Sequence, residues 1–204
     1  MITQIEVDGF KSLAGFRMHL SPGLNVLAGP NGSGKTNIVS FFEFLAHIIE
    51  SDLSEATSFL GGSGAIQRRV NQDLQSQIVA RVVGCYPFDQ GEHHPFSISP
   101  KSDDKTRFGF YDFGFTLQFT GDLEPVVFAR QHLRFKRCNK FIEHQRIEAE
   151  SHDWDLEIEM TLDLIQNKPN VKVSKLTGKM QESLIFLPAL KTQRTSPFNW
   201  NKSS

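Results

Sequence analysis

The chain has 204 residues, of which 39% are hydrophobic and 22% are charged, and its formal net charge is −1. This composition excludes a chain that is disordered as a whole, and the near-neutral charge by itself indicates no nucleic-acid or membrane partner. The two cysteines form no CxxC pair, no run reaches the roughly 18–20 apolar residues of a membrane helix, and the first residues lack a signal-peptide pattern. We therefore expect a cytoplasmic protein with reduced thiols.

The first 28 residues predict strands. Residues 2–7 and 16–20 alternate apolar with polar side chains, and a Ser-Pro-Gly turn separates them from the apolar run at 24–28. We expect these segments to form a small sheet in which residues 24–28 are a buried strand.

The next stretch, GPNGSGKT at residues 29–36, matches the pattern G-x-x-x-x-G-K-[ST]. Its glycines let the backbone curl so that N–H groups point at phosphate oxygens, and the following helix adds its dipole. In this pattern, Lys35 reaches the β- and γ-phosphates, and Thr36 places its hydroxyl on Mg²⁺. The alternative is a plain glycine turn between a strand and a helix, but the flanking apolar run and helical pattern favour a phosphate site.

The segment GPNGSGKTNI, together with IEVDGFKSLAGF before it, resembles the opening of ABC-type ATPases of the structural-maintenance-of-chromosomes (SMC) and RecF group, including the shorter OLD-like ATPases. This group carries one asparagine after the Gly-Pro pair and another after the Ser/Thr, and this chain has both as Asn31 and Asn37. The likeness covers residues 2 to about 50. It implies an α/β P-loop NTPase fold of ABC-ATPase type, in which an N-terminal lobe joins the P-loop helix to an antiparallel β-rich subdomain.

The resemblance also implies ATP and Mg²⁺ as cofactors and a set of nucleotide-binding residues, which are Gly29, Asn31, Gly32, Ser33, Gly34, Lys35, Thr36 and Asn37. Asn37 would lie near the α-phosphate. Lys11, in the Phe-Lys-Ser element, would lie near the nucleotide or near bound DNA. A solvated lysine at a strand end is the alternative for Lys11.

From Lys35 to residue 49 the chain is largely apolar and has no Gly or Pro, which predicts a helix covered on most sides. The sequence FLGGSG at 59–64 looks like the Leu-Ser-Gly-Gly signature of the group. It follows the P-loop helix directly and has Gly61 where the serine belongs, so we interpret it as a glycine loop that ends the helical region. A strand over 78–83 and a long loop near 87–109 are expected next.

Beyond the loop, three segments alternate with period two, at 113–119, 127–135 and 154–164. They predict half-buried strands of an antiparallel sheet with one solvated face. Arg130, Arg134 and Lys136 share one face of the middle strand, with His132 between them, and could contact DNA phosphates. Pairing with the acids of the next strand, Glu157, Glu159 and Asp163, is the alternative reading of this stripe. We expect turns at 168–170 and 177–179, and a short buried segment at 184–187.

The catalytic machinery of the group is missing from the sequence. The apolar run at 184–187 is followed by Pro188 and Ala189 and not by the expected acidic pair. No histidine switch is found, and Glu92-His93-His94 has no further ligand at metal spacing. Gln181 is a candidate for the Mg²⁺-binding glutamine of the group, and an ordinary surface glutamine is the alternative. The resemblance therefore implies an N-terminal lobe over residues 1–204 whose C-terminal catalytic lobe is absent. Its parts would be a P-loop core at 1–60, the β-rich subdomain at 61–180 and the start of a connection at 181–204.

These features predict the ATP-binding N-terminal part of an SMC/RecF/OLD-like ATPase that couples ATP binding and hydrolysis to a DNA transaction, in genome maintenance or anti-phage defence. By family analogy, the partners would be a second head in a homodimer formed through the ATP site, DNA, and an effector protein. The complete protein would be an ATPase, whereas this chain alone would bind ATP without efficient turnover. The alternative is a non-catalytic nucleotide-binding module whose ATP occupancy regulates partner assembly.

Overall fold

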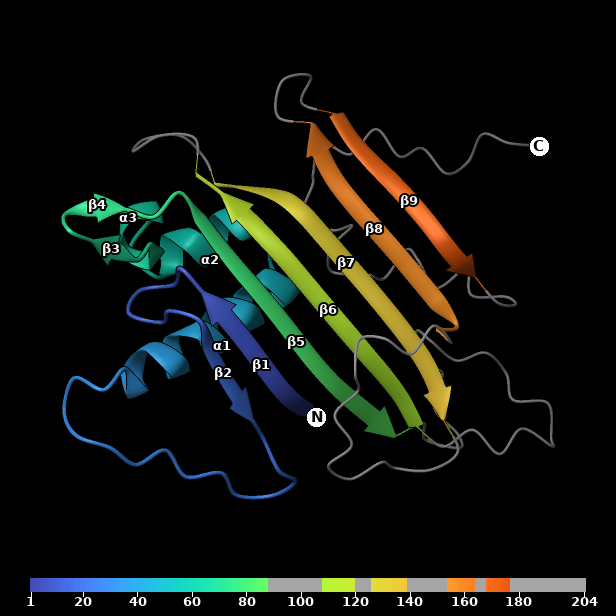
Figure 1. Ribbon diagram of the computed structural model, residues 1–204, viewed down its shortest axis with the longest axis horizontal. Helices are drawn as coiled ribbons and strands as arrows, with labels where there is room; N and C mark the ends of the chain where they lie inside the picture. Colours follow the sequence, from blue (N-terminus) through green and yellow to red (C-terminus); the bar gives the residue numbers. More distant parts are fainter. Residues whose placement is uncertain (88–107, 120–125, 139–153, 164–167, 177–204) are drawn as a thin grey trace.

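The computed structural model describes residues 1–87, 108–119, 126–138, 154–163 and 168–176. Their main feature is a seven-stranded sheet with the order β2-β1-β5-β6-β7-β8-β9, in which all neighbours are antiparallel (Figure 1). The strands are β1 (Ile2–Asp8), β2 (Phe16–His19), β5 (Gln77–Pro87), β6 (Phe108–Gln118), β7 (Val127–Cys138), β8 (Leu156–Asp163) and β9 (Lys168–Leu176). The predicted antiparallel sheet is confirmed, and it is continuous, because β1 and β2 join the later strands.

Helices cover one face of this sheet (Figure 1). They are α1 (Lys35–Glu50), α2 (Leu53–Phe59) and α3 (Ser63–Ile66), which is followed by a small hairpin of β3 (Arg69–Val70) and β4 (Asp73–Leu74). Phe41, Phe44 and Ile48 recur at helical spacing along α1 and are at most 2% exposed. They pack in one core cluster with Ile5 and Val7 of β1, so the apolar face of α1 is fixed against the start of the sheet.

The second side of α1 is open among the described residues. Val39 is 50% exposed and Ile49 is 51% exposed, so the described part of the chain leaves this one side of the helix uncovered. The described elements that bury α1 are the sheet and α2, whose Leu53 and Ala56 belong to the same core cluster. None of the described helices is long and apolar enough to cross a membrane.

Residues 24–28 do not form the predicted strand. Leu24 is 89% exposed and Val26 is 75% exposed, because the sheet ends at β2 and no described strand lies beside this segment. The side chain of Asn25 instead closes a local turn, accepting from Ser21 N at 3.0 Å and donating to Ser21 O at 2.8 Å. An apolar extended segment therefore leads to residues 29–36 without a described sheet partner.

Two smaller expectations fall within the described residues. The glycine loop is confirmed at Gly61 and Gly62, which have φ of 95° and 93° and follow the end of α2, but it does not end the helical region, because Ser63 and Gly64 begin α3. The turn expected at 168–170 is wrong, because these residues begin β9. A proline is tolerated there because β9 is an edge strand, where one side needs no N–H donor. The segments 177–179 and 184–187 and most of the loop expected at 87–109 lie outside the described residues.

Candidate nucleotide-binding site

The GPNGSGKT stretch forms an exposed loop that runs directly into α1. Gly32 and Gly34 have φ of 81° and 88°, a backbone conformation that side-chain-bearing residues rarely adopt. Gly34 is the N-cap of α1, and no side chain caps the helix or places an acid in its first turn. The N–H groups that open α1 are therefore left for an anionic ligand, and the helix dipole favours one.

Lys35 lies across this loop. Its Nζ donates to the carbonyl oxygens of Gly29 and Pro30, each at 2.7 Å, and to Ser33 Oγ at 3.3 Å. These acceptors belong to the exposed loop, so phosphate oxygens that enter it can replace them without breaking the core. The loop thus has the lysine, the curled backbone and the helix start that a phosphate cradle needs.

The turn that carries Lys11 lies beside the loop. Lys11 has a φ of 47°, and its Nζ is 5.7 Å from the centre of the Phe10 ring. Its neighbour Ser12 accepts a hydrogen bond from Asn37 Nδ2 at 2.6 Å. Ser12 belongs to the Phe-Lys-Ser element, but the sequence assigns it no role, because Ser12 and Asn37 are 25 positions apart.

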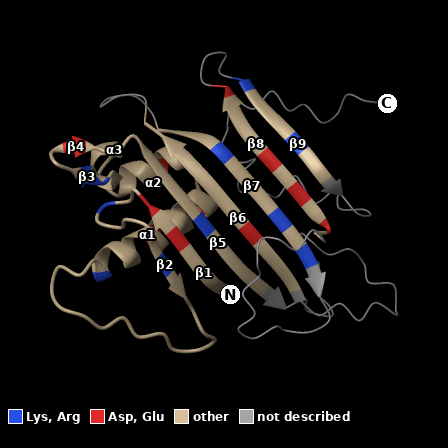
Figure 2. Cartoon of the chain, viewed as in Figure 1, with Lys and Arg blue, Asp and Glu red and all other residues tan. Residues whose placement is uncertain are grey.

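Arg130, Arg134 and Lys136 lie on β7, and their alternation places them on the sheet face away from the helices. Arg130 Nη2 is 2.5 Å from Glu159 Oε1, and Arg134 Nε is 2.8 Å from Glu157 Oε1, so the predicted pairing with acids of the next strand is present. Figure 2 shows basic positions of β7 beside acidic positions of β8. The side chain of Arg130 remains 62% exposed. Gln181 and Glu92-His93-His94 lie outside the described residues, and the described ones contain no cluster suited to a metal ion.

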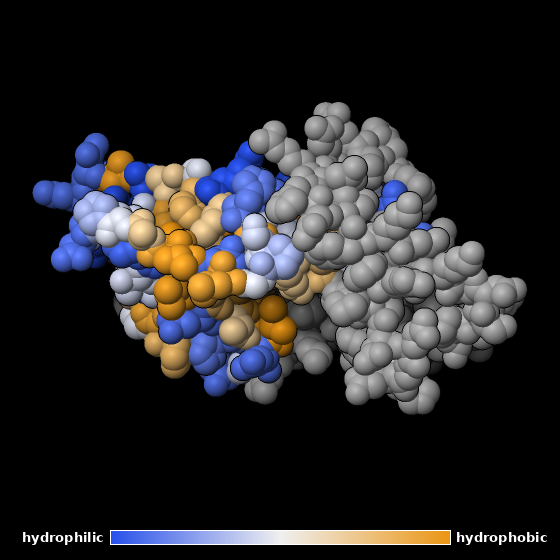
Figure 3. Space-filling view, turned by 90° about the horizontal axis from the view of Figure 1, so that it is seen from below, coloured by the Kyte–Doolittle hydropathy of each residue, from blue (hydrophilic) through white to orange (hydrophobic). Residues whose placement is uncertain are grey.

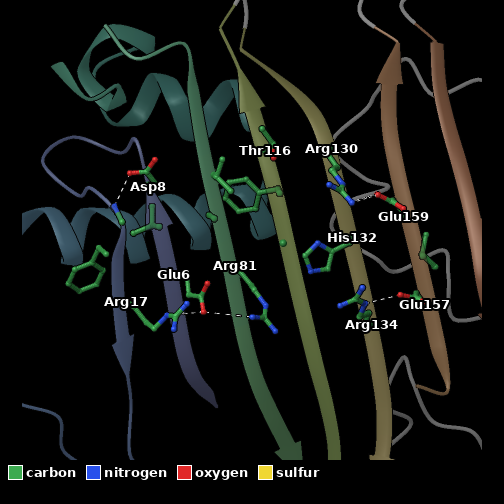
Figure 4. Close-up of a pocket in the computed structure, with 18 of the residues that line it drawn as sticks. Glu6, Asp8, Arg17, Arg81, Thr116, Arg130, His132, Arg134, Glu157 and Glu159 are labelled. Carbon is green, nitrogen blue, oxygen red and sulfur yellow. Dashed lines mark hydrogen bonds and ion pairs between the residues drawn. The ribbon is translucent and has the colours of Figure 1, made fainter. Parts of the chain in front are cut away.

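The same open face carries a groove of about 470 Å³, away from the P-loop (Figure 4). One row of cross-strand partners passes through it: Arg17, Glu6, Arg81, Gly114, His132 and Glu159. Gly114 leaves space for the ring of His132, because a Cβ there would lie 2.2 Å from His132 Cε1. The groove is therefore lined by charges of both signs, most of which are paired within the sheet.

A fully buried carboxylate, Asp112, holds the basic side chains in place on this face. Arg81 donates to it twice, at 2.8 and 3.0 Å, and Arg134 Nη1 lies 3.8 Å away. His132 Nε2 is 3.3 Å from the same carboxylate. Burial acts to raise the pKa of Asp112, but the hydrogen bonds from His132 and Arg81 outweigh it and lower that pKa to about 2. This cluster was not predicted from the sequence, because Arg81 and Asp112 are 31 positions apart in the chain.

The exposed glycine loop, the lysine across it and the uncapped helix start define a P-loop nucleotide-binding protein. The chain belongs to the family described as AAA ATPase domain, which matches residues 1–187. It is also similar to proteins named DNA replication and repair protein RecF. The one from Streptomyces avermitilis is 36% identical over 83 residues, which cover 38% of this chain and 22% of the relative. The one from Shewanella woodyi is 21% identical over 231 aligned positions, which cover 100% of this chain and 62% of the relative.

A solved chain described under "Structural biochemistry of ATP-driven dimerization and DNA stimulated activation of SMC ATPases" is 16% identical to this one. The alignment covers 100% of this chain and 92% of that chain, with a TM-score of 0.29, which is too low to support a fold. The chain thus spans 62% or less of the length of the two RecF relatives. The family match and the RecF likeness confirm the resemblance to SMC/RecF-like P-loop ATPases.

Proposed function

We propose that this chain is the ATP-binding lobe of an SMC/RecF-type ATPase that acts in a DNA transaction. The observation that carries the proposal is the arrangement at the start of α1, where an exposed glycine loop, the Lys35 ammonium and uncapped N–H groups converge. Membership of the AAA ATPase domain family supports ATP as the nucleotide. The names of the RecF relatives, which refer to DNA replication and repair, favour genome maintenance over anti-phage defence.

The residue roles follow from this arrangement. The backbone at Gly29, Asn31, Gly32, Ser33 and Gly34 would surround the phosphates, and Lys35 would turn from its loop acceptors to the β- and γ-phosphates. Thr36, exposed in the first turn of α1, fits Mg²⁺ as a hydroxyl ligand, and the ion would neutralise phosphate charge there. Asn37 would lie near the α-phosphate. Lys11 directly precedes Ser12, which is hydrogen-bonded to Asn37, so Lys11 would share the surface beside the P-loop.

Turnover requires groups that the described residues do not bring to the loop, so we propose that a second lobe or subunit completes the site. The exposed apolar side chains of Leu24, Val26 and Val39 support this, because they flank the P-loop on both sides. Figure 3, seen from below, shows apolar residues gathered on the described part of the surface. A head-to-head homodimer through the ATP site is the arrangement that the family resemblance favours.

We assign the DNA contact to Arg130, Arg134 and Lys136 on the open face. The exposed head of Arg130 supports the assignment, while the ion pairs with Glu157 and Glu159 would have to loosen as phosphates replace carboxylates. The competing function, a nucleotide-dependent assembly module without turnover, predicts ATP binding with no DNA-stimulated hydrolysis. Measuring phosphate release by the full-length protein, with and without DNA, separates the two.

The test of the nucleotide site is Lys35→Ala, with Lys172→Ala as the matched control because Lys172 is exposed on β9. Removing a charge-assisted contact to phosphate should weaken binding of a fluorescent Mg-ATP analogue about 100-fold, while Lys172→Ala binds like the wild type. Thermal unfolding without nucleotide should be the same for all three proteins. An unchanged ATP affinity in Lys35→Ala would refute the assignment.

A further inference from the structure

The turn of residues 9–13, between β1 and β2, is held as a rigid unit. Inside it, Gly9 N donates to Leu13 O at 3.1 Å and Leu13 N donates to Phe10 O at 2.8 Å. It is tied to the end of α3 by the bonds Lys11 N to Ile66 O at 2.8 Å and Arg68 N to Gly9 O at 2.9 Å. The position of this turn is therefore set by hydrogen bonds within the turn and by hydrogen bonds to the end of α3.

The turn is also anchored to α1, the helix that begins at the P-loop. Phe10 is fully buried, and its ring centre lies 5.3 Å from that of Phe41 and 5.6 Å from that of Phe44. Such aromatic contacts in a packed core leave little freedom for relative movement. The turn and α1 thus form one body.

Ser12 projects from this turn against both ends of the Lys35-Thr36 pair. Beyond the pair, its Oγ accepts from Asn37 Nδ2 at 2.6 Å. Before the pair, it lies against Gly34, where an added Cβ would be 3.2 Å from Ser12 Oγ and 3.8 Å from Leu13 Cδ2. One side chain therefore touches the residues on either side of the two that the motif assigns to phosphate and Mg²⁺.

We propose that Ser12 is a positioning residue for the P-loop. Its hydroxyl holds the Asn37 amide by a hydrogen bond and packs against Gly34, so that the first turn of α1 presents Lys35 and Thr36 in one orientation. This inference rests on the proposed function, because its effect is felt only when a nucleotide binds there. Without the hydroxyl, the Asn37 amide is released, and the bound nucleotide itself must order Lys35 and Thr36. The free energy spent on this ordering weakens nucleotide binding.

A serine suits the position because its hydroxyl is short and Gly34 leaves room for it. Threonine keeps the hydroxyl and should preserve the contact, whereas alanine removes it. Ser54 is a matched control, since it is exposed on α2 and no hydrogen bond links it to the P-loop among those described. The comparison of Ser12→Ala, Ser12→Thr and Ser54→Ala therefore isolates the hydroxyl.

The experiment measures the dissociation constant of a fluorescent Mg-ATP analogue for the full-length protein and each variant. Loss of one hydrogen bond should make Ser12→Ala bind about three- to tenfold more weakly, with Ser12→Thr and Ser54→Ala within about twofold of the wild type. Thermal unfolding without nucleotide should stay within about 1 °C for Ser12→Ala, because the contact is at the surface. A purely structural role would instead shift the unfolding temperature together with affinity.

A double-mutant cycle with Asn37→Ala tests the route. If Ser12 acts through Asn37, Ser12→Ala should weaken binding by no more than about twofold further in the Asn37→Ala background. A full, additive loss, or an unchanged affinity in Ser12→Ala alone, overturns the inference. Lys35→Ala separates this result from failure of the proposed function. If wild type and Lys35→Ala bind the analogue alike, the proposed nucleotide site and the role of Ser12 are both refuted. If Lys35→Ala loses binding but Ser12→Ala does not, only the role of Ser12 is refuted.

Discussion

Replacing Asp112 by asparagine tests the electrostatics of the open sheet face. The carboxylate is fully buried, receives two hydrogen bonds from Arg81 at 2.8 and 3.0 Å, and lies 3.3 Å from His132 Nε2. Asparagine keeps the shape of the side chain but removes the charge, so Arg81 loses the acceptor pair that offsets its own burial. The prediction is a loss of folding stability that depends on pH.

The magnitude follows from proton linkage. The pKa of Asp112 falls from its usual value of 3.8 to about 2 in the folded protein. A depressed carboxyl pKa adds stability above the unfolded-state value, and this contribution is lost as pH falls toward the folded-state value. This lowering of the pKa corresponds to about 2 kcal/mol at pH 7 and to about half of that at pH 3. The unpaired Arg81 in the variant raises the expected loss at pH 7 to about 2–4 kcal/mol.

The assay is urea unfolding followed by circular dichroism at pH 7 and pH 3, with Asp73→Asn as control because Asp73 is exposed on the β3–β4 hairpin. The gap in unfolding free energy between wild type and Asp112→Asn should shrink by about 1 kcal/mol between the two pH values. Asp73→Asn should match the wild type at both. A gap of the same size at pH 7 and pH 3 would refute the reasoning.

Two further predictions concern the turn and the basic side chains. Gly9 has a φ of 85°, and an added Cβ would lie 2.3 Å from Gln77 O, so Gly9→Ala should destabilise the fold by at least about 2 kcal/mol in urea unfolding. Gly15 is the control: it has a φ of 52° and nothing within 4 Å of an added Cβ, so Gly15→Ala should lower the unfolding free energy by only about 1 kcal/mol. Charge reversal at Arg130 and Arg134 should weaken DNA binding and flatten its salt dependence, and Glu157→Gln with Glu159→Gln should do the opposite by releasing the arginines from their ion pairs. If DNA affinity responds to neither change, these arginines only form ion pairs between β7 and β8 and do not contact DNA.

Local patterns predicted much of this protein. The alternation of side chains located the strands of the sheet, and the sheet in turn placed Arg130 and Arg134 on one face, opposite acids of the next strand. The P-loop motif fixed the start of α1 at Lys35. These features depend on residues that are close in sequence, where backbone conformation and side-chain period act directly.

What the sequence could not predict depends on distant partners. Residues 24–28 have the composition of a buried strand, but a strand forms only beside another, and the described sheet provides none there. The cluster around Asp112 needs Arg81, 31 positions away, to arrive in register across β5 and β6. Pro169 suggests a turn when only its sequence neighbours are considered. Its actual place, in the edge strand β9, depends on the pairing of β9 with β8, which the local sequence does not reveal.

β1 shows how one strand can serve three purposes that substitutions should separate. Its inward residues Ile5 and Val7 pack against the core under α1, and outward Glu6 pairs with arginines on both neighbouring strands. The turn that follows it carries Ser12 to Asn37 at the P-loop. Changes at Ile5 should therefore alter stability, changes at Glu6 should alter the charge of the open face, and changes at Ser12 should alter nucleotide affinity alone. Because all three positions share one backbone, the nucleotide loop is held by the strand that also supports the charged groove.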